Sequence, residues 1–176
     1  MSDSAKLRIF AMLDANGDGV ISRSEYLARV DRVVSALGFE AGHPVVLAAR
    51  AAHEGVWQDM DADQDGRVTF EEYREWAGPE AFERSCRAVL GSMFDIADAD
   101  ADGRLTRDEF VRLRTAMGNA KSDVETAFEN LDTDRDGYVD RDAYLEGIRG
   151  FVLTGISAMA PVYGDGGVPR EAQPSR

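Results

Sequence analysis

The sequence predicts an all-α protein in which four helix–loop–helix units form two pairs and pack into one compact unit. The first observation behind this prediction is a twelve-residue acidic window that occurs four times in the 176 residues. The second is that each window lies between segments whose apolar residues recur at helical spacing. Because one unit exposes an apolar stripe that it cannot bury alone, we expect the first unit to pair with the second and the third with the fourth.

The four windows share a pattern position by position. Position 1 is Asp, position 3 is Asn or Asp, position 5 is Asp, position 6 is Gly and position 8 is Ile, Val or Leu. Position 12 is Glu in three windows and Ala in the fourth. In chain order the windows read DANGDGVISRSE (14–25), DADQDGRVTFEE (61–72), DADADGRLTRDE (98–109) and DTDRDGYVDRDA (132–143).

The flanking segments repeat in the same register. One aromatic residue stands four positions before each window and another directly follows position 12. Breaks between the helical patterns fall at residues 38–44, at Gly78-Pro79 and at Gly118-Asn119. Since the flanks of the fourth window keep this register, Ala143 truly occupies position 12. The aromatic residues are Phe10, Trp57, Phe94 and Phe128 before the windows, and Tyr26, Tyr73, Phe110 and Tyr144 after them.

This pattern divides the chain into a four-unit domain, residues 1–163, and a remainder, 164–176, that we expect to be disordered. The first two units cover about residues 3–78 and the last two about 79–150. An apolar tail over 151–163 is expected to fill a groove of the protein itself. A docking or self-association segment is the alternative for this tail, whose apolar residues are Phe151, Val152, Leu153, Ile156 and Met159.

Composition narrows the classes of partner. The net charge is −13, and more than half of the 33 acidic residues lie in the four windows. Such a charge argues against nucleic acid and anionic membranes as partners and favours cations. The N-terminus lacks the apolar stretch of a signal peptide, and no run approaches the ~18 apolar residues of a membrane-spanning helix. With Cys86 as the only cysteine, we expect a cytoplasmic monomer whose protein target, if it has one, is unknown.

The alternating acids predict sites for a hard divalent cation. Calcium takes six to eight oxygen ligands at about 2.3–2.6 Å, supplied by side chains at positions 1, 3 and 5, a backbone carbonyl at position 7 and a bidentate glutamate at position 12. The glycine at position 6 permits the sharp turn between them. The predicted ligands of the three complete windows are Asp14, Asn16, Asp18, Val20 and Glu25; Asp61, Asp63, Asp65, Arg67 and Glu72; and Asp98, Asp100, Asp102, Arg104 and Glu109.

The fourth window lacks the glutamate that closes the shell. We therefore expect three calcium sites and a fourth loop that is weak or empty and serves as the structural partner of the third. Magnesium, which favours six ligands and keeps several waters, suits the fourth loop as well as calcium does and is the expected competitor. The remaining donors of this loop are Asp132, Asp134, Asp136, Tyr138 and Asp140.

The apolar residues at position 8 are β-formers within polar loops. We expect a short antiparallel contact between the loops of each pair, with Ile21 beside Val68 and Leu105 beside Val139. Such a contact would couple the two ion sites of a pair mechanically.

The windows and their spacing resemble the EF-hand superfamily and, more narrowly, the sarcoplasmic calcium-binding proteins and their bacterial relative calerythrin. A lengthened first interval and a tail after the last unit are similar to that family, and the resemblance covers residues 1 to about 163. It implies a compact helical fold whose two halves pack together, and a calcium-buffering role. Calerythrin-like proteins tend to lose the second loop, whereas here the second loop is complete and the fourth departs, so the family's pattern of occupied sites does not carry over.

A calcium buffer or store is the preferred function, and a sensor that exposes an apolar groove to a target is the alternative. Sensors use methionine-rich grooves, whereas the six methionines here are spread thinly. We expect no enzyme activity. His43 and His53 fit no catalytic spacing and are expected to flank helices, Cys86 to be a packed thiol, and Trp57 and Trp76 to belong to the core.

Overall fold

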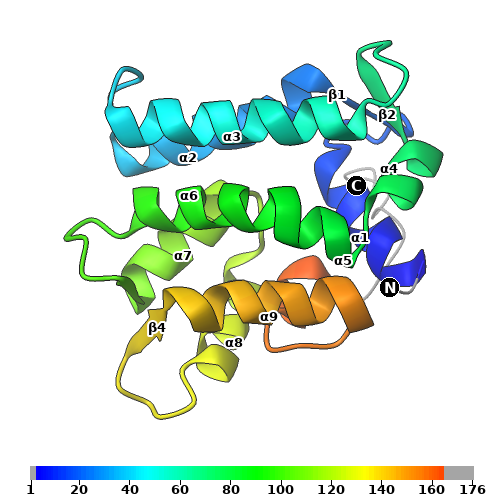
Figure 1. The fold of residues 1–176 in the computed structure, drawn as a ribbon. Helices are drawn as coiled ribbons and strands as arrows, with labels where there is room; N and C mark the ends of the chain where they lie inside the picture. Colours follow the sequence, from blue (N-terminus) through cyan, green and yellow to red (C-terminus); the bar gives the residue numbers. More distant parts are fainter. Residues whose placement is uncertain (1–2, 165–176) are drawn as a thin grey trace, which may run out of the picture.

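A computed structural model of the chain, which describes residues 3–164, contains the four predicted helix–loop–helix units (Figure 1). Proline at the first helical position begins α3, and a left-handed Gly38 ends α2, as the sequence signals indicate. The helices of the first half are α1 (Asp3–Leu13), α2 (Arg23–Leu37), α3 (Pro44–Met60) and α4 (Phe70–Trp76).

The second half repeats this arrangement with one irregularity. The helix that enters the third loop begins as α5 at Pro79, passes through a π-helical turn, η1, and continues as α6. The elements are α5 (Pro79–Ala81), η1 (Phe82–Cys86), α6 (Arg87–Ala97), α7 (Arg107–Ala116), α8 (Lys121–Leu131), α9 (Arg141–Thr154) and the 3-10 turn η2 (Ala160–Tyr163).

The loops of each pair are joined by a short antiparallel sheet. In the first pair Ile21 lies opposite Val68, and in the second Leu105 lies opposite Val139, so the predicted contacts are confirmed. All four of these side chains are almost fully buried. The strands are β1 (Val20–Ser22) with β2 (Arg67–Thr69), and β3 (Arg104–Thr106) with β4 (Tyr138–Asp140).

The two halves pack directly on each other. Figure 1 shows α2 and α3 lying over α6, with α9 on the other side of α6. The larger core cluster spans both halves, because Val30 and Val33 of α2 and Val46 of α3 pack with helices of the second half. A smaller cluster around Trp57 fills the first half. The prediction of two pairs in one compact unit is therefore confirmed.

The apolar tail packs mostly against its own chain. Phe151 and Met159 are completely buried, and the ring of Tyr163 stacks on that of Phe151 with centroids 4.3 Å apart. Asn119 holds the turn by donating a hydrogen bond of 2.7 Å to the carbonyl of Val162. Ile156 is the exception: its side chain is 80% exposed, because the chain turns outward after α9 ends, and the expectation that it fills a groove is wrong. Of the predicted disordered segment 164–176, all but Gly164 lies outside the described residues.

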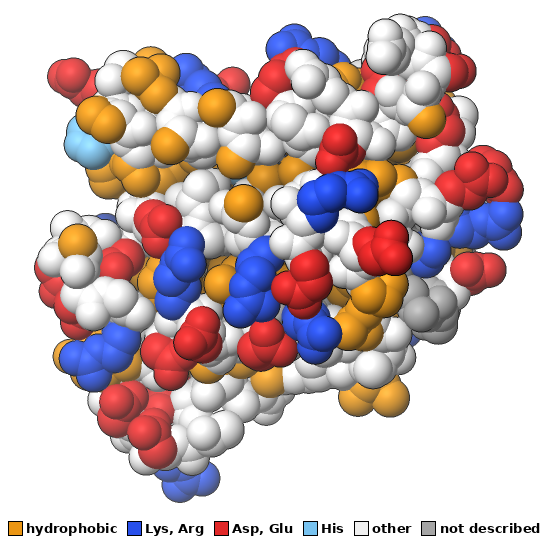
Figure 2. All heavy atoms as spheres, in the orientation of Figure 1, with side chains coloured by type: hydrophobic (Ala, Val, Ile, Leu, Met, Phe, Trp, Pro, Cys, Tyr) orange, Lys and Arg blue, Asp and Glu red, His pale blue; other side chains and the backbone are white. Residues whose placement is uncertain are grey.

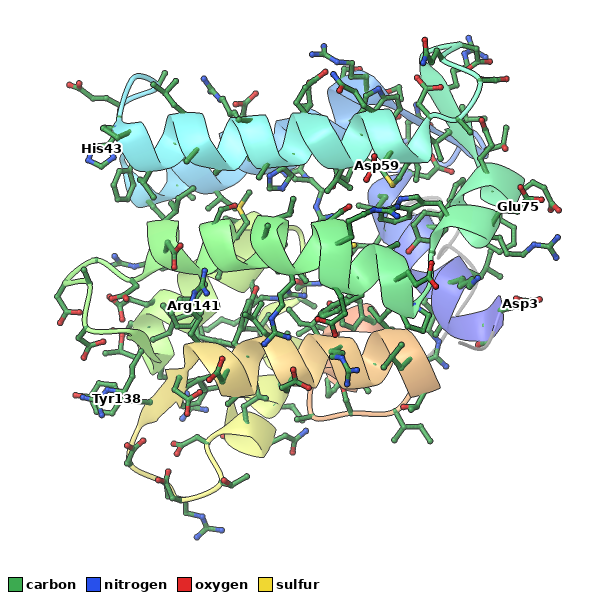
Figure 3. The ribbon with its side chains drawn as sticks, in the orientation of Figure 1. Asp3, His43, Asp59, Glu75, Tyr138 and Arg141 are labelled. Carbon is green, nitrogen blue, oxygen red and sulfur yellow. The ribbon has the colours of Figure 1, made fainter. Side chains whose placement is uncertain are left out.

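Ion pairs connect α6 and α9 on the surface. A band of acidic and basic side chains crosses this face in Figure 2. Arg87 pairs with Glu146 at 3.0 Å, and Arg141, labelled in Figure 3, pairs with Asp95 at 3.1 Å. These pairs are exposed to solvent, so they orient the helices while adding little stability. Across residues 3–164, every helix is too short or too polar to span a lipid bilayer.

The two histidines have different environments. His43 caps the N-terminus of α3, where its Nδ1 accepts from the backbone N–H of Val45 at 3.4 Å, as expected of a helix-flanking residue. The same prediction is wrong for His53, which is in the middle of α3, 3% exposed, with Nδ1 2.8 Å from the carbonyl oxygen of Ala49. The prediction failed because α3 begins at Pro44, nine residues before His53, so His53 lies inside the helix and not at its end.

Burial lowers the pKa of His53 to about 4, the bond to Ala49 opposes this shift, and the charge of Arg29 adds to it. The folded pKa lies below the ordinary value of about 6.5, so the unfolded chain binds the extra proton and stability falls as the pH drops below about 6.5. Between pH 7.5 and 5.0, in saturating calcium, wild type should lose about 2 kcal/mol more unfolding free energy than His53→Leu.

Urea unfolding at several pH values measures this difference. His43→Gln is the matched control, because His43 is exposed, and its stability should follow that of wild type across the pH range. Equal pH dependence in wild type and His53→Leu would contradict the assignment of a buried neutral imidazole.

Candidate metal sites

Each of the four loops is closed by the same network of backbone-to-side-chain hydrogen bonds. The aspartate at position 1 accepts from the backbone N–H of position 6, position 3 accepts from position 5, and position 5 accepts from position 7. The distances for the position 1 bond are 2.9 Å for Asp14, 3.1 Å for Asp61, 2.9 Å for Asp98 and 3.1 Å for Asp132. The position 5 bonds, accepted by Asp18, Asp65, Asp102 and Asp136, measure 3.1, 2.8, 2.8 and 2.9 Å.

The backbone explains why position 6 is glycine. At this position φ is between 84° and 90° in all four loops, a conformation that costs other residues energy. Position 4 is left-handed too, which the sequence pattern did not reveal, because Gly17 occurs there only in the first loop. Gln64, Ala101 and Arg135 adopt φ of 61°, 57° and 61° at that position. The loop network outweighs the local preference of these residues.

This network brings the predicted side-chain ligands together. In the second, third and fourth loops, the aspartates at positions 1, 3 and 5 each place a carboxylate oxygen within 4.8 Å of the others. In the first loop Asn16 takes position 3, and its Oδ1 accepts from the backbone N–H of Asp18 at 2.8 Å, like the aspartates at this position in the other loops. Three closely spaced carboxylates repel one another in the absence of a cation, so the arrangement favours a divalent ion.

The residue at position 9 caps the helix that follows each complete loop. The side chains of Ser22, Thr69 and Thr106 accept from the backbone N–H at position 12, and the glutamate at position 12 accepts in return from the backbone N–H at position 9. This reciprocal arrangement is a capping box. The motif is visible in the sequence as S/T-x-x-E at positions 9 to 12 of the three complete windows.

One oxygen of each position 12 glutamate makes the cap, and the other extends toward the start of the loop. In the first loop, Glu25 Oε2 accepts from the N–H of Ser22 at 2.9 Å, while Oε1 accepts from the N–H of Asn16 at 3.1 Å. In the third loop, Glu109 Oε1 accepts from the N–H of Ala99 at 3.1 Å. The carboxylate therefore lies across the mouth of the loop, opposite the position 1 aspartate.

The second loop offers oxygens that lack a well-placed protein donor. Asp61 Oδ1 and Glu72 Oε1, at the two ends of the loop, are buried and accept no hydrogen bond of normal geometry, although the backbone N–H groups of Ala62 and Asp63 act on the Glu72 carboxylate. A buried carboxylate oxygen without a donor is costly, and a calcium ion between positions 1 and 12 would satisfy both atoms. The residues present therefore fit the predicted ion.

Hydrogen bonding keeps the glutamates that close the first two loops ionised. The side chain of Ser22 is the main cause that lowers the pKa of Glu25, and the backbone N–H of Thr69, followed by its hydroxyl, lowers that of Glu72. Both carboxylates accept from fixed donors at a helix N-terminus, where negative charge is favourable. They are therefore anionic at neutral pH.

The fourth loop differs at its closing position. Asp140 caps α9 by accepting from the N–H of Ala143 at 2.7 Å, but Ala143 has no side chain to return the bond or reach an ion. A hollow of about 120 Å³ lies between Ala143 and the loop aspartates. Asp132 Oδ1 is buried without a partner, as Asp61 Oδ1 is in the second loop. The carboxylate cluster alone therefore does not distinguish this loop from the others; position 12 does.

A side chain from the third loop supplies positive charge to the fourth. Arg104 Nη1 lies 3.8 Å from Asp136 Oδ2, and its guanidinium is 4.5 Å from the centre of the Tyr138 ring. Figure 3 shows Tyr138 at the outer edge of this loop pair. The backbone of Arg104 is a predicted ligand of the third loop, so one residue contacts both loops of the pair.

The remaining candidates of the sequence take structural positions. Cys86 is in η1, where its side chain is partly buried and packs against the larger core cluster, as predicted for a packed thiol, and burial raises its pKa to about 12. Trp57 is 3% exposed in the core. Trp76 is only partly buried, and it lines a cavity between the two halves.

Comparison with known proteins agrees with this geometry. Residues 3–78 and 87–149 match the EF-hand domain pair family. Calerythrin of Saccharopolyspora erythraea is 27% identical over 161 residues, which cover 85% of this chain and 90% of that protein. A probable calcium-binding protein of rice, CML16 of Oryza sativa subsp. japonica, is 32% identical over 140 residues, 78% of this chain and 74% of that protein.

The solved structure of a calcium-binding protein from Streptomyces coelicolor is similar to this chain. It was reported as a structural basis for prokaryotic calcium-mediated regulation. The TM-score is 0.72 at 28% identity, and the match covers 86% of this chain and 99% of that chain.

The two functions of the position 12 glutamate can be separated by mutation. Glu109→Gln keeps an oxygen for the capping box but removes the charge and bidentate ligation, whereas Glu109→Ala removes both. Calorimetric titration should find one calcium site fewer in each variant. In chelator, Glu109→Ala should be less stable than Glu109→Gln by about 1 kcal/mol. An unchanged number of sites in both variants would show that this glutamate is not a ligand.

Ala143→Glu should convert the fourth loop into a complete site. The hollow beside Ala143 has room for the longer side chain, and glutamate there would restore the capping box with Asp140. Titration should detect one more calcium site than in wild type. Ala143→Gln is the matched control, because it has the same size without the charge and should add no tight site. A fourth site in the glutamine variant would mean that filling the hollow, and not carboxylate ligation, closes the loop.

Proposed function

This chain belongs to the EF-hand domain pair family of calcium-binding proteins, and from this premise we propose that it is a calcium buffer with three working sites. The ions would bind in the first, second and third loops, whose position 12 is glutamate. The fourth loop would bind weakly or stay empty and support the third loop through the β3–β4 contact. We place the protein in the cytoplasm as a monomer without enzyme activity.

The observation that carries the buffer proposal is the position of the methionines and the tail. Met60, Met93, Met117 and Met159 are all at most 5% exposed. A sensor presents adaptable methionine side chains to a target helix, whereas these are packed in the interior. Phe151, Met159 and Tyr163 of the tail region belong to the larger core cluster. The apolar surface that a target helix would need is therefore occupied by the chain itself.

Charge supports a role in holding several ions. Three calcium ions would bring the net charge from −13 to about −7 and relieve the repulsion within each aspartate cluster. Since the folded loops bind the ions and the unfolded chain does not, calcium would stabilise the fold. Magnesium is the expected competitor, because the same hard oxygen donors suit it.

A sensor is the second candidate, and one specific finding favours it. The similar structure from Streptomyces coelicolor was reported in connection with calcium-mediated regulation. If this chain acts in the same way, calcium must rearrange the packed helices so that buried apolar surface becomes available to a partner. The two proposals therefore differ in what calcium does to the interior.

Calcium titration by calorimetry, with and without millimolar magnesium, is the experiment that separates them. A buffer should show three sites, with an apparent affinity that magnesium reduces by competition. NMR spectra of ¹³C-methyl methionine should then show Met93 and Met159 in a packed environment with calcium bound. Cooperative binding unaffected by magnesium, together with methionine signals that become solvent-exposed in calcium, would contradict the buffer and support the sensor.

A further inference from the structure

A cavity of about 90 Å³ lies between the two halves, away from the four loops. Its wall is largely apolar and includes Met12, Met60 and Phe82. The π-helical turn η1 contributes Phe82 and Cys86 to this wall. Such turns are frequent at functional sites, because the wider turn displaces side chains from their ordinary helical positions.

Two arginines face this apolar space without a carboxylate partner. Arg114 of α7 is 1% exposed and lines the cavity together with Arg29 of α2. Neither forms an ion pair with an acidic side chain of residues 3–164, although the chain has 33 acidic residues. A buried charge without a counter-charge is strongly unfavourable. Arg29 is only partly buried, but Arg114 is enclosed, and the ring of Tyr163 and the hydroxyl of Tyr144 offset part of this cost without supplying a counter-charge.

The free atoms of Arg114 define the kind of group it can hold. Nη1 is directed to the hydroxyl of Tyr144 at 3.4 Å and the sulfur of Met117 at 3.8 Å. Nε and Nη2 are buried and donate no hydrogen bond of normal geometry, and the remaining neighbour of the guanidinium is Tyr163, whose ring centre lies 5.6 Å from Cζ. These two nitrogens form one edge of the guanidinium, the edge that binds a carboxylate through two parallel hydrogen bonds.

The other unpaired polar atoms of the cavity wall are also donors. Arg29 Nε and the indole Nε1 of Trp76 are buried without acceptors, and both residues line the cavity. Among the lining residues that the structure describes, no buried side-chain acceptor lacks a partner. A wall that offers only donors at one place and apolar side chains elsewhere matches an anion with an apolar body.

We propose that this cavity binds a small organic anion, a monocarboxylate with a short apolar chain, whose carboxylate pairs with the Nε–Nη2 edge of Arg114 and with Arg29. The volume limits the ligand to a short chain, since about 90 Å³ is well below the roughly 150 Å³ of an apolar protein cavity that holds benzene. None of the residues that line the cavity is a predicted ion ligand, so this proposal does not depend on the buffer proposal.

Butyrate is the probe, and butan-1-ol, of the same length without the charge, is the matched ligand control. With the full chain in saturating calcium, butyrate should bind saturably and at least about tenfold more tightly than butan-1-ol. In ¹³C-methyl methionine spectra of wild type, butyrate should shift Met12, Met60 and Met117, which line the cavity, but not Met93, which is buried elsewhere. Equal binding of the alcohol, or no saturable shift at the three lining methionines, would overturn the proposal.

Variants test the role of the guanidinium. Arg114→Met should weaken butyrate binding by roughly tenfold or more, and Arg114→Lys, which keeps the charge without the two-nitrogen edge, by less. Arg112→Met is the control, because Arg112 is exposed on the same helix and should leave affinity unchanged. An equal loss in Arg112→Met would show that the anion is attracted by surface charge and overturn the site. If Arg114→Met does not fold, the wild-type methionine shifts decide the question alone.

Discussion

The glutamate at position 12 connects the ion site to the helix framework in each complete loop. One of its oxygens caps the following helix, and the other lies across the mouth of the loop. The next residue is the aromatic that packs into the core, as Tyr26 follows Glu25 and Tyr73 follows Glu72. A single turn of helix thus fixes the ligand, the helix N-terminus and a core side chain at once. The orientation of the helix after each loop depends on this carboxylate.

Because the loops are paired, the constraint that the glutamate places on one loop acts on both helix–loop–helix units of that half of the protein. The position 8 residues are almost fully buried and hydrogen-bonded through the short sheets, so one loop cannot change its conformation without its partner. This explains why the fourth loop keeps the full turn network although its closing residue is Ala143. The third loop needs β4 as the partner of β3, whether or not an ion binds beside it. A loop without the closing glutamate can therefore still be required for the fold.

Most of the fold could be predicted because the repeat has several independent signals in one register. The loop acids, the glycines, the position 8 apolar residues and the flanking aromatics all gave the same frame, and the structure follows it. The predicted features that failed depend on long-range packing. Ile156 is apolar by type, but the chain direction after Gly155 carries it outward, and His53 is polar by type, but the packing of α3 encloses it.

Features that the sequence did not reveal arise where a local preference yields to the surroundings. The left-handed residues at position 4 have no common side chain, since Gln64, Ala101 and Arg135 all occur there. The π-helical turn η1 has no glycine or proline within it. Arg112 and Arg114 lie two residues apart on α7, yet Arg112 is exposed and Arg114 is buried. The difference arises because the docking of the two halves encloses Arg114 alone.

The central cavity and the ion loops share their supporting helices. Tyr26 and Tyr73, each one residue after a closing glutamate, both line the cavity, and Arg29 is one helical turn further along α2. A movement of Glu25 or Glu72 that tightened its loop would therefore also displace a wall of the cavity. Arg114 lies on α7, whose N-terminus is set in the same way by Glu109. The three closing glutamates thus link the loops to the interior, since each begins a helix that carries a residue lining the cavity.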